Sequence, residues 1–259
     1  MMDLKNNGAV IGYGHLGKSI AKTFNIKKYF DITGSSATLD EIASCRYIFM
    51  ALPTPTVNGE CDTNLTRDYC RQLAQYPQSE NAIIIIRSTV LPGTCRAIHE
   101  ATGLNVVSHP EFLSEDTLDK DASDPMLIVL GIDNSVLRKH VWSLYNASKC
   151  QLKVETDTVT AETIKYALNT FFTTKVIFAN MLYDICQKSG ADYDTIKTVL
   201  TKHPWGSGNH WRVIDKGGRG AGGHCLIKDL KAFQTYTQSD LLKLVDRINE
   251  QLLHESGKS

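Results

Sequence analysis

The stretch Ala9–Phe24 reads AVIGYGHLGKSIAKTF and decides the fold. A short β-branched run comes first, three glycines follow in GxGxxG spacing, and a helix-like segment begins directly after them. In such a strand-turn-helix unit, Gly12 permits the tight turn, Gly14 lets the backbone approach a pyrophosphate at the helix N-terminus, and Gly17 allows close helix-strand packing. The stretch predicts a dinucleotide site, with a glycine-rich turn between packed elements as the alternative.

An acidic residue follows at the distance that such a site requires. Asp31 lies 19 residues after Gly12, at the end of the weak strand Lys28–Phe30. A carboxylate there can bind the adenosine ribose hydroxyls and disfavour a 2′-phosphate, so we expect NAD as the cofactor in preference to NADP. The alternative is that Asp31 is an ordinary loop-entry residue. The expected contacts from the glycine turn are Gly12, Tyr13, Gly14, His15, Leu16 and Gly17.

Five short apolar runs, the first of them in the opening stretch, predict the strands of one sheet. They are Ala9–Ile11, Tyr47–Leu52, Ala82–Ile86, Asn105–Val107 and Met126–Leu130. Unbroken apolar runs of this length are typical of strands buried on both faces of a parallel sheet, with helices or loops between them. The fold class expected for this part of the chain is therefore α/β, with a Rossmann-like parallel sheet.

Two of these strands end in small hydroxylated residues. The motif ALPTP covers residues 51–55 and RSTV covers residues 87–90. Ligands of open α/β sheets bind at the carboxyl edge of the strands, so Pro53, Thr54, Ser88 and Thr89 are candidate cofactor contacts. The alternative is turn chemistry, in which Thr54 and Ser88 bond to their own backbone.

Strand signals stop near residue 155, and helical periodicity takes over. Apolar spacing predicts a long amphipathic helix over Thr160–Lys188, with Thr160 as its N-cap and an end near Gly190. Two more helices are expected at Tyr193–Lys202 and Ser239–Leu253, separated by a glycine-rich loop. The predicted organisation is an NAD-binding domain over residues 1–154 and an all-α central, dimerisation domain over residues 155–259.

Composition narrows the possible partners. The 259 residues carry 28 Lys plus Arg and 28 Asp plus Glu without a long block of either sign, so neither nucleic acid nor a membrane surface is expected as a partner. The seven scattered cysteines include no CxxC pair, which favours free thiols in a reducing compartment and no metal site. The first residues lack a signal-peptide apolar segment and no apolar run could span a bilayer, so a cytoplasmic location is expected.

The second half of the chain carries a possible thiol site. Lys165 and Asn169 stand four residues apart and share one helix face, although a lone lysine there would ordinarily be solvated. The stretch GGRGAGGHCLIKDLKAF, residues 217–233, places Cys225 after five glycines and shortly before Lys228 and Asp229. A nearby ammonium would hold the thiol as thiolate. The alternative is a buried structural cysteine in a glycine-rich turn.

Taken together, these motifs resemble those of the UDP-glucose/GDP-mannose 6-dehydrogenase family. The matching motifs run in order along almost the whole chain: GYGHLG, ALPTP, RSTV, HPEFLSE (His109–Glu115), DPMLIVLG, AETIKYALNTFFTTK and GAGGHCLIKD. The resemblance implies an NAD-dependent, two-step, four-electron oxidation of the C6 hydroxymethyl of a nucleotide sugar to a carboxylate, in the service of polysaccharide precursor synthesis. It also implies a homodimer that pairs through the long helix.

The resemblance implies roles for individual residues. Asp229, acting through water with help from Lys165, is the expected base for the hydroxyl proton, and Cys225 captures the aldehyde as a thiohemiacetal that becomes a thioester. Lys165 and Asn169 stabilise the oxyanions. Further expected residues are Thr89 for positioning water, Glu111 or Glu115 for thioester hydrolysis, Glu115 also near the cofactor, Phe112 and Leu113 for backbone contacts to the substrate, and Gly222 and Gly223 beside the thiol. A solvated loop is the alternative for the acidic stretch.

The match has departures. The chain stops at Ser259, which predicts a short form without the family's C-terminal UDP-binding domain. His224 makes GGHC similar to the branch that oxidises N-acetylated UDP-sugars, whereas Lys228 and Asp229 resemble the glucose and mannose branch. Two other functions therefore stay open: a dehydrogenase for a smaller alcohol or aldehyde, and a non-catalytic NAD-binding dimer that acts through a partner.

Overall fold

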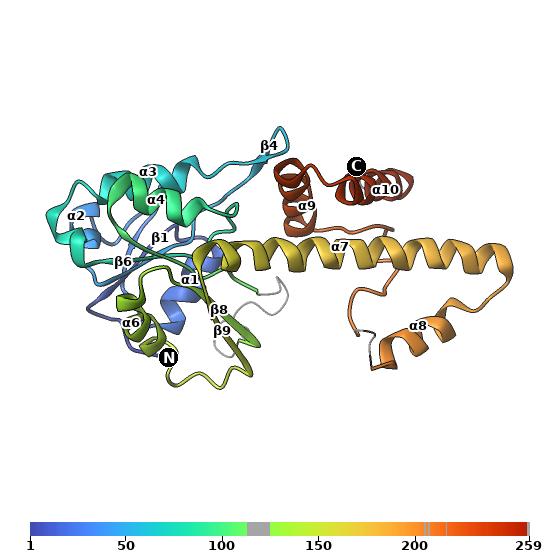
Figure 1. The fold of residues 1–259 in the computed structure, drawn as a ribbon, viewed down its shortest axis with the longest axis horizontal. Helices are drawn as coiled ribbons and strands as arrows, with labels where there is room; N and C mark the ends of the chain where they lie inside the picture. The colour runs from blue at the N-terminus through green and yellow to red at the C-terminus, as the bar shows by residue number, and fades with distance from the viewer. Residues whose placement is uncertain (113–124, 205, 207, 216, 258–259) are drawn as a thin grey trace. The chain divides into compact units, whose positions relative to one another are not determined.

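The computed structural model describes residues 1–112, 125–204, 206, 208–215 and 217–257 (Figure 1). Its internal contacts divide the chain into two compact units, the first made of Met1–Pro55 with Asp62–Lys165 and the second of Thr56–Cys61 with Tyr166–Ser259. This division falls at Lys165, inside a helix, whereas the sequence predicts a domain boundary at residue 154. The predicted domain assignment remains a proposal.

The first unit is built on a seven-stranded sheet. Its strands are β1 (Gly8–Ile11), β2 (Lys28–Phe30), β3 (Tyr47–Met50), β6 (Ile83–Ile86), β7 (Asn105–Ser108), β8 (Leu127–Gly131) and β9 (Leu152–Thr156), in the order β2-β1-β3-β6-β7-β8-β9. All neighbouring pairs are parallel except β7 and β8, which are antiparallel. The order reverses between β1 and β3, the crevice at which doubly wound sheets bind nucleotides.

Helices cover both faces of this sheet. They are α1 (His15–Thr23), α2 (Leu39–Ala43), α3 (Asn64–Leu73), η1 (Pro77–Asn81), α4 (Thr94–Thr102), η2 (Ser135–Leu137) and α6 (Arg138–Ser143). Figure 1 shows α2, α3 and α4 on one face and α1 and α6 on the other.

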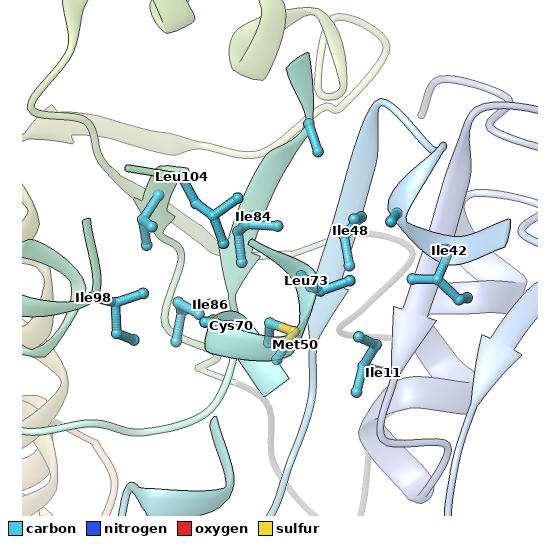
Figure 2. Close-up of a cluster of buried hydrophobic side chains, with 14 of the residues drawn as sticks. Ile11, Ile42, Ile48, Met50, Cys70, Leu73, Ile84, Ile86, Ile98 and Leu104 are labelled. Carbon is cyan, nitrogen blue, oxygen red and sulfur yellow. The ribbon is translucent and has the colours of Figure 1, made fainter. Parts of the chain in front are cut away.

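The central strand β6 shows why the strand runs are continuously apolar. Ile84 and Ile86 belong to the core beneath α2, α3 and α4, part of which Figure 2 shows, while Ile83 and Ile85 belong to the core on the opposite face. Since successive side chains of a strand alternate between faces, both must be apolar when both faces are covered. The predicted parallel sheet is confirmed.

One strand of this sheet departs from the sequence expectation. The sequence places no strand at β9, where Lys153 and Glu155 interrupt the apolar residues. In the structure β9 is an edge strand that pairs with β8 alone, and its residues are exposed or half-buried, so it does not need a continuous apolar run. Strand signals based on unbroken apolar runs miss such an edge.

The second unit combines a small hairpin with helices. The hairpin is β4 (Thr56–Val57) and β5 (Glu60–Cys61), and the helices are α7 (Thr158–Ser189, counted here from Tyr166), α8 (Tyr193–Lys202), α9 (His224–Thr237) and α10 (Asp240–Glu255). Asn58 and Gly59 both have positive φ, as a two-residue hairpin turn requires. Thr56 Oγ1 donates to the Lys228 carbonyl at 2.9 Å, which joins the hairpin to α9.

The ends of α7 correct one prediction and support another. Thr160 is not the N-cap: α7 begins at Thr158, and the Asp157 carboxylate accepts from the Thr160 backbone N–H at 3.0 Å. The helix ends as expected at Gly190, whose φ is +76° and whose N–H donates to the Cys186 carbonyl. The continuous helix places Lys165 and Asn169 one turn apart.

The glycine-rich loop is also shorter than expected. The sequence treats Cys225, Lys228 and Asp229 as loop residues, whereas α9 begins at residue 224 and carries all three. The backbone becomes helical immediately after Gly223, which has a φ of +81°. The correction places the thiol in the first turn of a helix.

Candidate active site

The glycine turn has the geometry that a dinucleotide needs. Gly12 has a φ of +91°, and a Cβ on Gly17 would lie 1.9 Å from the Gly12 carbonyl oxygen, so both positions require glycine. Gly14 is different, because a Cβ there would meet nothing within 4 Å. It precedes the first residue of α1, where unpaired backbone N–H groups and the helix dipole favour an anion. The structure thus leaves open space at the position expected to receive the pyrophosphate.

This contrast gives a prediction with an internal control. Gly14→Ala should weaken NAD binding at least about tenfold and leave thermal stability near wild type, because its Cβ enters only the open space beside α1. Gly17→Ala should lower both, with a stability loss of about 1–3 kcal/mol from the clash with backbone. NAD titration and thermal unfolding measure the two effects. Wild-type affinity in Gly14→Ala would place the cofactor elsewhere.

Asp31 lies against the glycine turn. Its Oδ2 accepts from the Tyr13 backbone N–H at 2.7 Å, and its Oδ1 accepts from the Thr33 N–H at 2.9 Å and the Thr33 hydroxyl at 2.7 Å. The bonds from Thr33 and then the bond from Tyr13 lower the pKa of Asp31. The bonds to Thr33 are those of a loop-entry residue, and the bond to Tyr13 places the same carboxylate beside the turn. Both predicted roles are compatible with this geometry.

The loops after β3 and β6 are tied to each other by hydroxyl groups. Thr54 Oγ1 donates to the Thr89 carbonyl and Ser88 Oγ donates to the Leu52 carbonyl, each at 2.7 Å. The alternative that Thr54 and Ser88 bond to their own backbone is wrong, because each bonds to the neighbouring loop. Pro53 is exposed between them. The candidate residues of the two loops are therefore adjacent at the carboxyl edge of the sheet.

Lys165 is not a solvated surface lysine. It is 5% exposed, and its Nζ lies 3.3 Å from Glu111 Oε1 and 5.8 Å from the centre of the Phe112 ring. The first unit therefore brings together three residues predicted to act on the substrate. An ammonium and a carboxylate placed this close can stabilise developing negative charge and exchange protons with a bound water.

A buried polar network that the sequence did not predict supports the segment before Glu111. Arg87 Nη1 donates to the His109 carbonyl at 2.9 Å, and the Tyr145 hydroxyl lies 2.6 Å from His109 Nδ1. Burial, reinforced by the Arg87 charge, lowers the pKa of His109 well below its usual value, so the imidazole is neutral near pH 7. These residues also line a cavity of about 100 Å³ with Leu16 and Phe112.

Glu162 is a second residue that sequence reasoning missed. Its carboxylate accepts from the backbone N–H of Gly93 at 2.6 Å and of Cys95 at 2.8 Å, and the residue is 1% exposed. It therefore supplies the N-terminal cap of α4, because the N-cap residue Gly93 has no side chain. Burial raises the pKa of Glu162. The cap ties the first turn of α7 to the segment that follows Thr89.

The second unit holds the other predicted polar residues. Asp229 is 1% exposed, with Oδ1 at 2.5 Å from Lys228 Nζ and Oδ2 accepting from Asn169 Nδ2 at 2.6 Å. A buried carboxylate needs such partners, and here a lysine and an amide supply them. The structure thus brings Asn169, Lys228 and Asp229 together within this unit.

Cys225 differs from the other cysteines of the chain. It is exposed in the first turn of α9, while Cys45, Cys61, Cys70, Cys95 and Cys186 are buried and Cys150 is half-buried. The alternative of a buried structural thiol is therefore wrong for Cys225. Gly222 and Gly223 precede it, and a Cβ at either position would meet nothing within 4 Å. The thiol is therefore accessible at the start of α9.

Two of the predicted site residues, Leu113 and Glu115, lie outside the described part of the chain. Within the described residues, no group of three or more His, Cys, Asp or Glu side chains is arranged to hold a metal ion. A helix long and apolar enough to cross a membrane is likewise absent from the described residues.

The parallel sheet, the glycine turn and the open N-terminus of α1 define a Rossmann-type dinucleotide-binding protein. Residues 16–149 match the NAD binding domain of the UDP-glucose/GDP-mannose dehydrogenase family, and residues 159–251 match its central domain. The chain belongs to the UDP-glucose/GDP-mannose dehydrogenase family.

Individual relatives agree with this assignment. The UDP-glucose 6-dehydrogenase of Rickettsia conorii is 30% identical over 226 residues, which are 82% of this chain and 50% of that relative. Among solved structures, a UDP-glucose dehydrogenase from Pyrobaculum islandicum has a TM-score of 0.80 at 22% identity, over 94% of this chain and 68% of the other. Mycobacterium tuberculosis 3-hydroxyisobutyrate dehydrogenase has the same fold at 16% identity, with a TM-score of 0.74 over 99% of this chain and 95% of the other.

The matched relatives are longer than this chain. The chain spans about half the length of the curated relatives that it matches. The reaction and substrates of those longer proteins are therefore a matter of proposal for this chain.

Proposed function

We propose that the protein catalyses the NAD-dependent oxidation of the C6 hydroxymethyl of a nucleotide sugar to a carboxylate, in two hydride transfers through a thioester on Cys225. The observation that carries the proposal is the exposure of this one thiol in the first turn of α9, in a unit that also holds Asn169, Lys228 and Asp229. The names of the relatives supply the substrate class.

The first unit fits NAD. The open space at Gly14, the start of α1 and the Asp31 carboxylate beside Tyr13 are suited to a pyrophosphate and an adenosine ribose. Bound NAD would supply a hydride acceptor, one molecule for each two-electron step. Tighter binding of NADP than of NAD would contradict the role given to Asp31.

The first step converts the alcohol to an aldehyde, releasing one proton and one hydride. Asp229 is the proposed acceptor of the proton, through a water molecule, with Lys165 assisting. The Cys225 thiolate then adds to the aldehyde carbon and forms a thiohemiacetal. The position of Cys225 at a helix N-terminus favours the negatively charged thiolate.

The second step removes a hydride and a proton from the thiohemiacetal, which leaves a thioester on Cys225. Lys165 and Asn169 are the proposed donors to the oxyanions that form when the thiolate adds to the aldehyde and when water adds to the thioester. Water then attacks the thioester, releasing the carboxylate and the Cys225 thiol. Glu111, held 3.3 Å from Lys165, is the proposed acceptor of the proton from this water.

Formation of NADH from NAD tests the proposal. A panel of UDP- and GDP-sugars, with 3-hydroxyisobutyrate as the smaller alcohol, is mixed with the full chain and followed by absorbance. We expect turnover of at least one nucleotide sugar and none of the smaller alcohol. No signal with any nucleotide sugar, in a protein that still binds NAD, would sink the proposal, and oxidation of the smaller alcohol alone would favour the alternative function.

We also propose that the protein forms a homodimer through α7. Along this helix, the apolar residues Phe171, Phe178, Met181 and Ile185 are 46–55% exposed. Their spacing of seven, three and four residues places them on one face, and an apolar helix face of this length is typical of an interface between helices.

Thiol chemistry of the proposed kind suits a reducing compartment such as the cytoplasm.

The dimer gives a separate prediction. Phe178→Asp should convert a dimer to a monomer in light scattering after size exclusion, because it places a charge in the middle of the apolar face. Val199→Asp is the matched control, since Val199 is 60% exposed on α8, outside this face. A monomeric wild-type protein at micromolar concentration would contradict the proposal.

A further inference from the structure

The glycine-rich loop before Cys225 is held by α10 through a buried asparagine. Asn249 Oδ1 accepts from the Ala221 backbone N–H at 2.7 Å, and Asn249 Nδ2 donates to the Ala221 carbonyl at 3.2 Å. The residue is 1% exposed. One side chain thus satisfies both backbone groups of Ala221, four residues before the thiol, and does so where water could not replace it.

The packing around this contact restricts the loop further. Gly220 has a φ of +87°, and a Cβ there would lie 3.0 Å from Asn249 Oδ1 and 3.3 Å from Leu252 Cβ. The positive φ favours glycine at this position, and the close approach of the loop to α10 leaves little room for a side chain. The absence of a side chain at Gly220 lets Ala221 reach Asn249.

A second set of contacts fixes the residue before Gly220. The Arg219 backbone N–H donates to Ser256 Oγ at 2.8 Å, and its guanidinium donates to Asn180 Oδ1 at 3.0 Å and to Asp184 Oδ2 at 2.8 Å. The loop is therefore anchored to α10 and α7 at residues 219 and 221. Gly222 and Gly223, which follow, have no such packing.

We infer that Asn249 is a positioning residue for Cys225. It fixes the anchored point Ala221, from which Gly222 and Gly223, with open space at their Cβ positions, lead into α9. Without this anchor, the start of α9 would sample more positions and the thiol would spend less time in the placement that the reaction uses. The inference rests on the proposed function for its catalytic consequence, although the anchoring itself can be measured on the thiol alone.

The experiment measures alkylation of Cys225 by iodoacetamide in the full chain, by peptide mass spectrometry, between about pH 6 and pH 9. Asn249→Leu removes both bonds at similar size. We expect its alkylation rate at neutral pH to fall at least about fivefold and the midpoint of its pH profile to move toward about 8.5, the value of an ordinary thiol. We expect kcat to fall about 10–100-fold with NAD affinity unchanged, because the glycine turn belongs to the first unit.

Two controls separate positioning from general destabilisation. Leu242→Ala weakens the apolar core of the second unit and leaves the bonds of Asn249 to Ala221 in place, and Gln251→Leu places a leucine on the exposed face of α10. Neither should change the pH profile of Cys225. A wild-type profile in folded Asn249→Leu, or the same change in Leu242→Ala, would overturn the inference.

A further variant serves if Asn249→Leu does not fold. Asn249→Asp keeps an acceptor for the Ala221 N–H and loses the donor to its carbonyl, so we expect a smaller shift in the same direction, and an unchanged profile would overturn the inference. The proposed function can fail independently of this inference. If the wild-type chain shows no sugar turnover but its alkylation profile still depends on Asn249, the positioning role of Asn249 stands and the proposed reaction is wrong.

Discussion

Replacing Cys225 with serine is expected to lower steady-state oxidation of the nucleotide sugar by roughly 10³-fold or more. A serine hydroxyl is far less acidic than a thiol, so little alkoxide is available to capture the aldehyde and no thioester forms. In the proposed mechanism, the first hydride transfer does not require the thiol. Rapid mixing should therefore still show formation of up to one NADH per protein chain, followed by near arrest.

Cys150→Ser is the matched control for this variant. Cys150 is the half-buried cysteine of the first unit, and its replacement should leave turnover close to wild type. Full turnover by Cys225→Ser would show that the reaction does not need a covalent intermediate on Cys225. A Cys225 adduct trapped from the wild-type protein, with the mass of the sugar acyl group, would identify the nucleophile directly.

Lys165→Met is the second variant with a large expected effect, a fall in kcat of about 10²–10³-fold. The substitution removes the ammonium proposed to stabilise the oxyanions while keeping an unbranched side chain of similar length. Steady-state rates at saturating NAD measure the effect. Because the proposed NAD site is the glycine turn and does not include this lysine, NAD affinity should stay close to wild type.

The difficulty with this variant is that Lys165 is buried beside a carboxylate. Its loss removes the ammonium that pairs with Glu111, which by itself destabilises the fold. The double variant Lys165→Met with Glu111→Gln removes both charges of this pair, and we expect stability to recover while activity does not. Recovery of activity in the double variant would assign Lys165 a structural role. Lys188→Met, at the exposed end of the same helix, should leave activity unchanged.

The sequence predicts best the helices, strands and turns whose own residues carry a recognisable pattern. The glycine spacing after β1 predicts a strand-turn-helix unit, and a run such as that of β6 is typical of a strand covered on both faces. The hairpin at residues 56–61 was missed although Asn58-Gly59 is a strong local turn signal. Edge strand β9 carries a weaker signal, because its residues are exposed or half-buried and need not be continuously apolar.

The start of α9 shows how a strong local cue can mislead. The five glycines favoured a loop, yet the apolar spacing after Gly223 is helical, and the structure follows the spacing. The correction matters for function, because it replaces a thiol in a flexible loop with a thiol at a helix N-terminus.

Other site features depend on contacts between distant parts of the chain. Glu162 caps α4 across 69 residues and Asn249 holds Ala221 across 28. No local pattern marks either residue as a cap or an anchor. Lys165 was predicted as a site residue, but its burial against Glu111 follows only from the packing of α7 on the segment after β7.

The most direct test of the account is the number of NADH molecules formed per molecule of nucleotide sugar consumed, with sugar limiting and NAD in excess. Oxidation of an alcohol to a carboxylate removes four electrons, so the proposed mechanism predicts two NADH per sugar and a uronate as the product. One NADH per sugar with an aldehyde released into solution would contradict it, because the thiol would then take no part in the reaction.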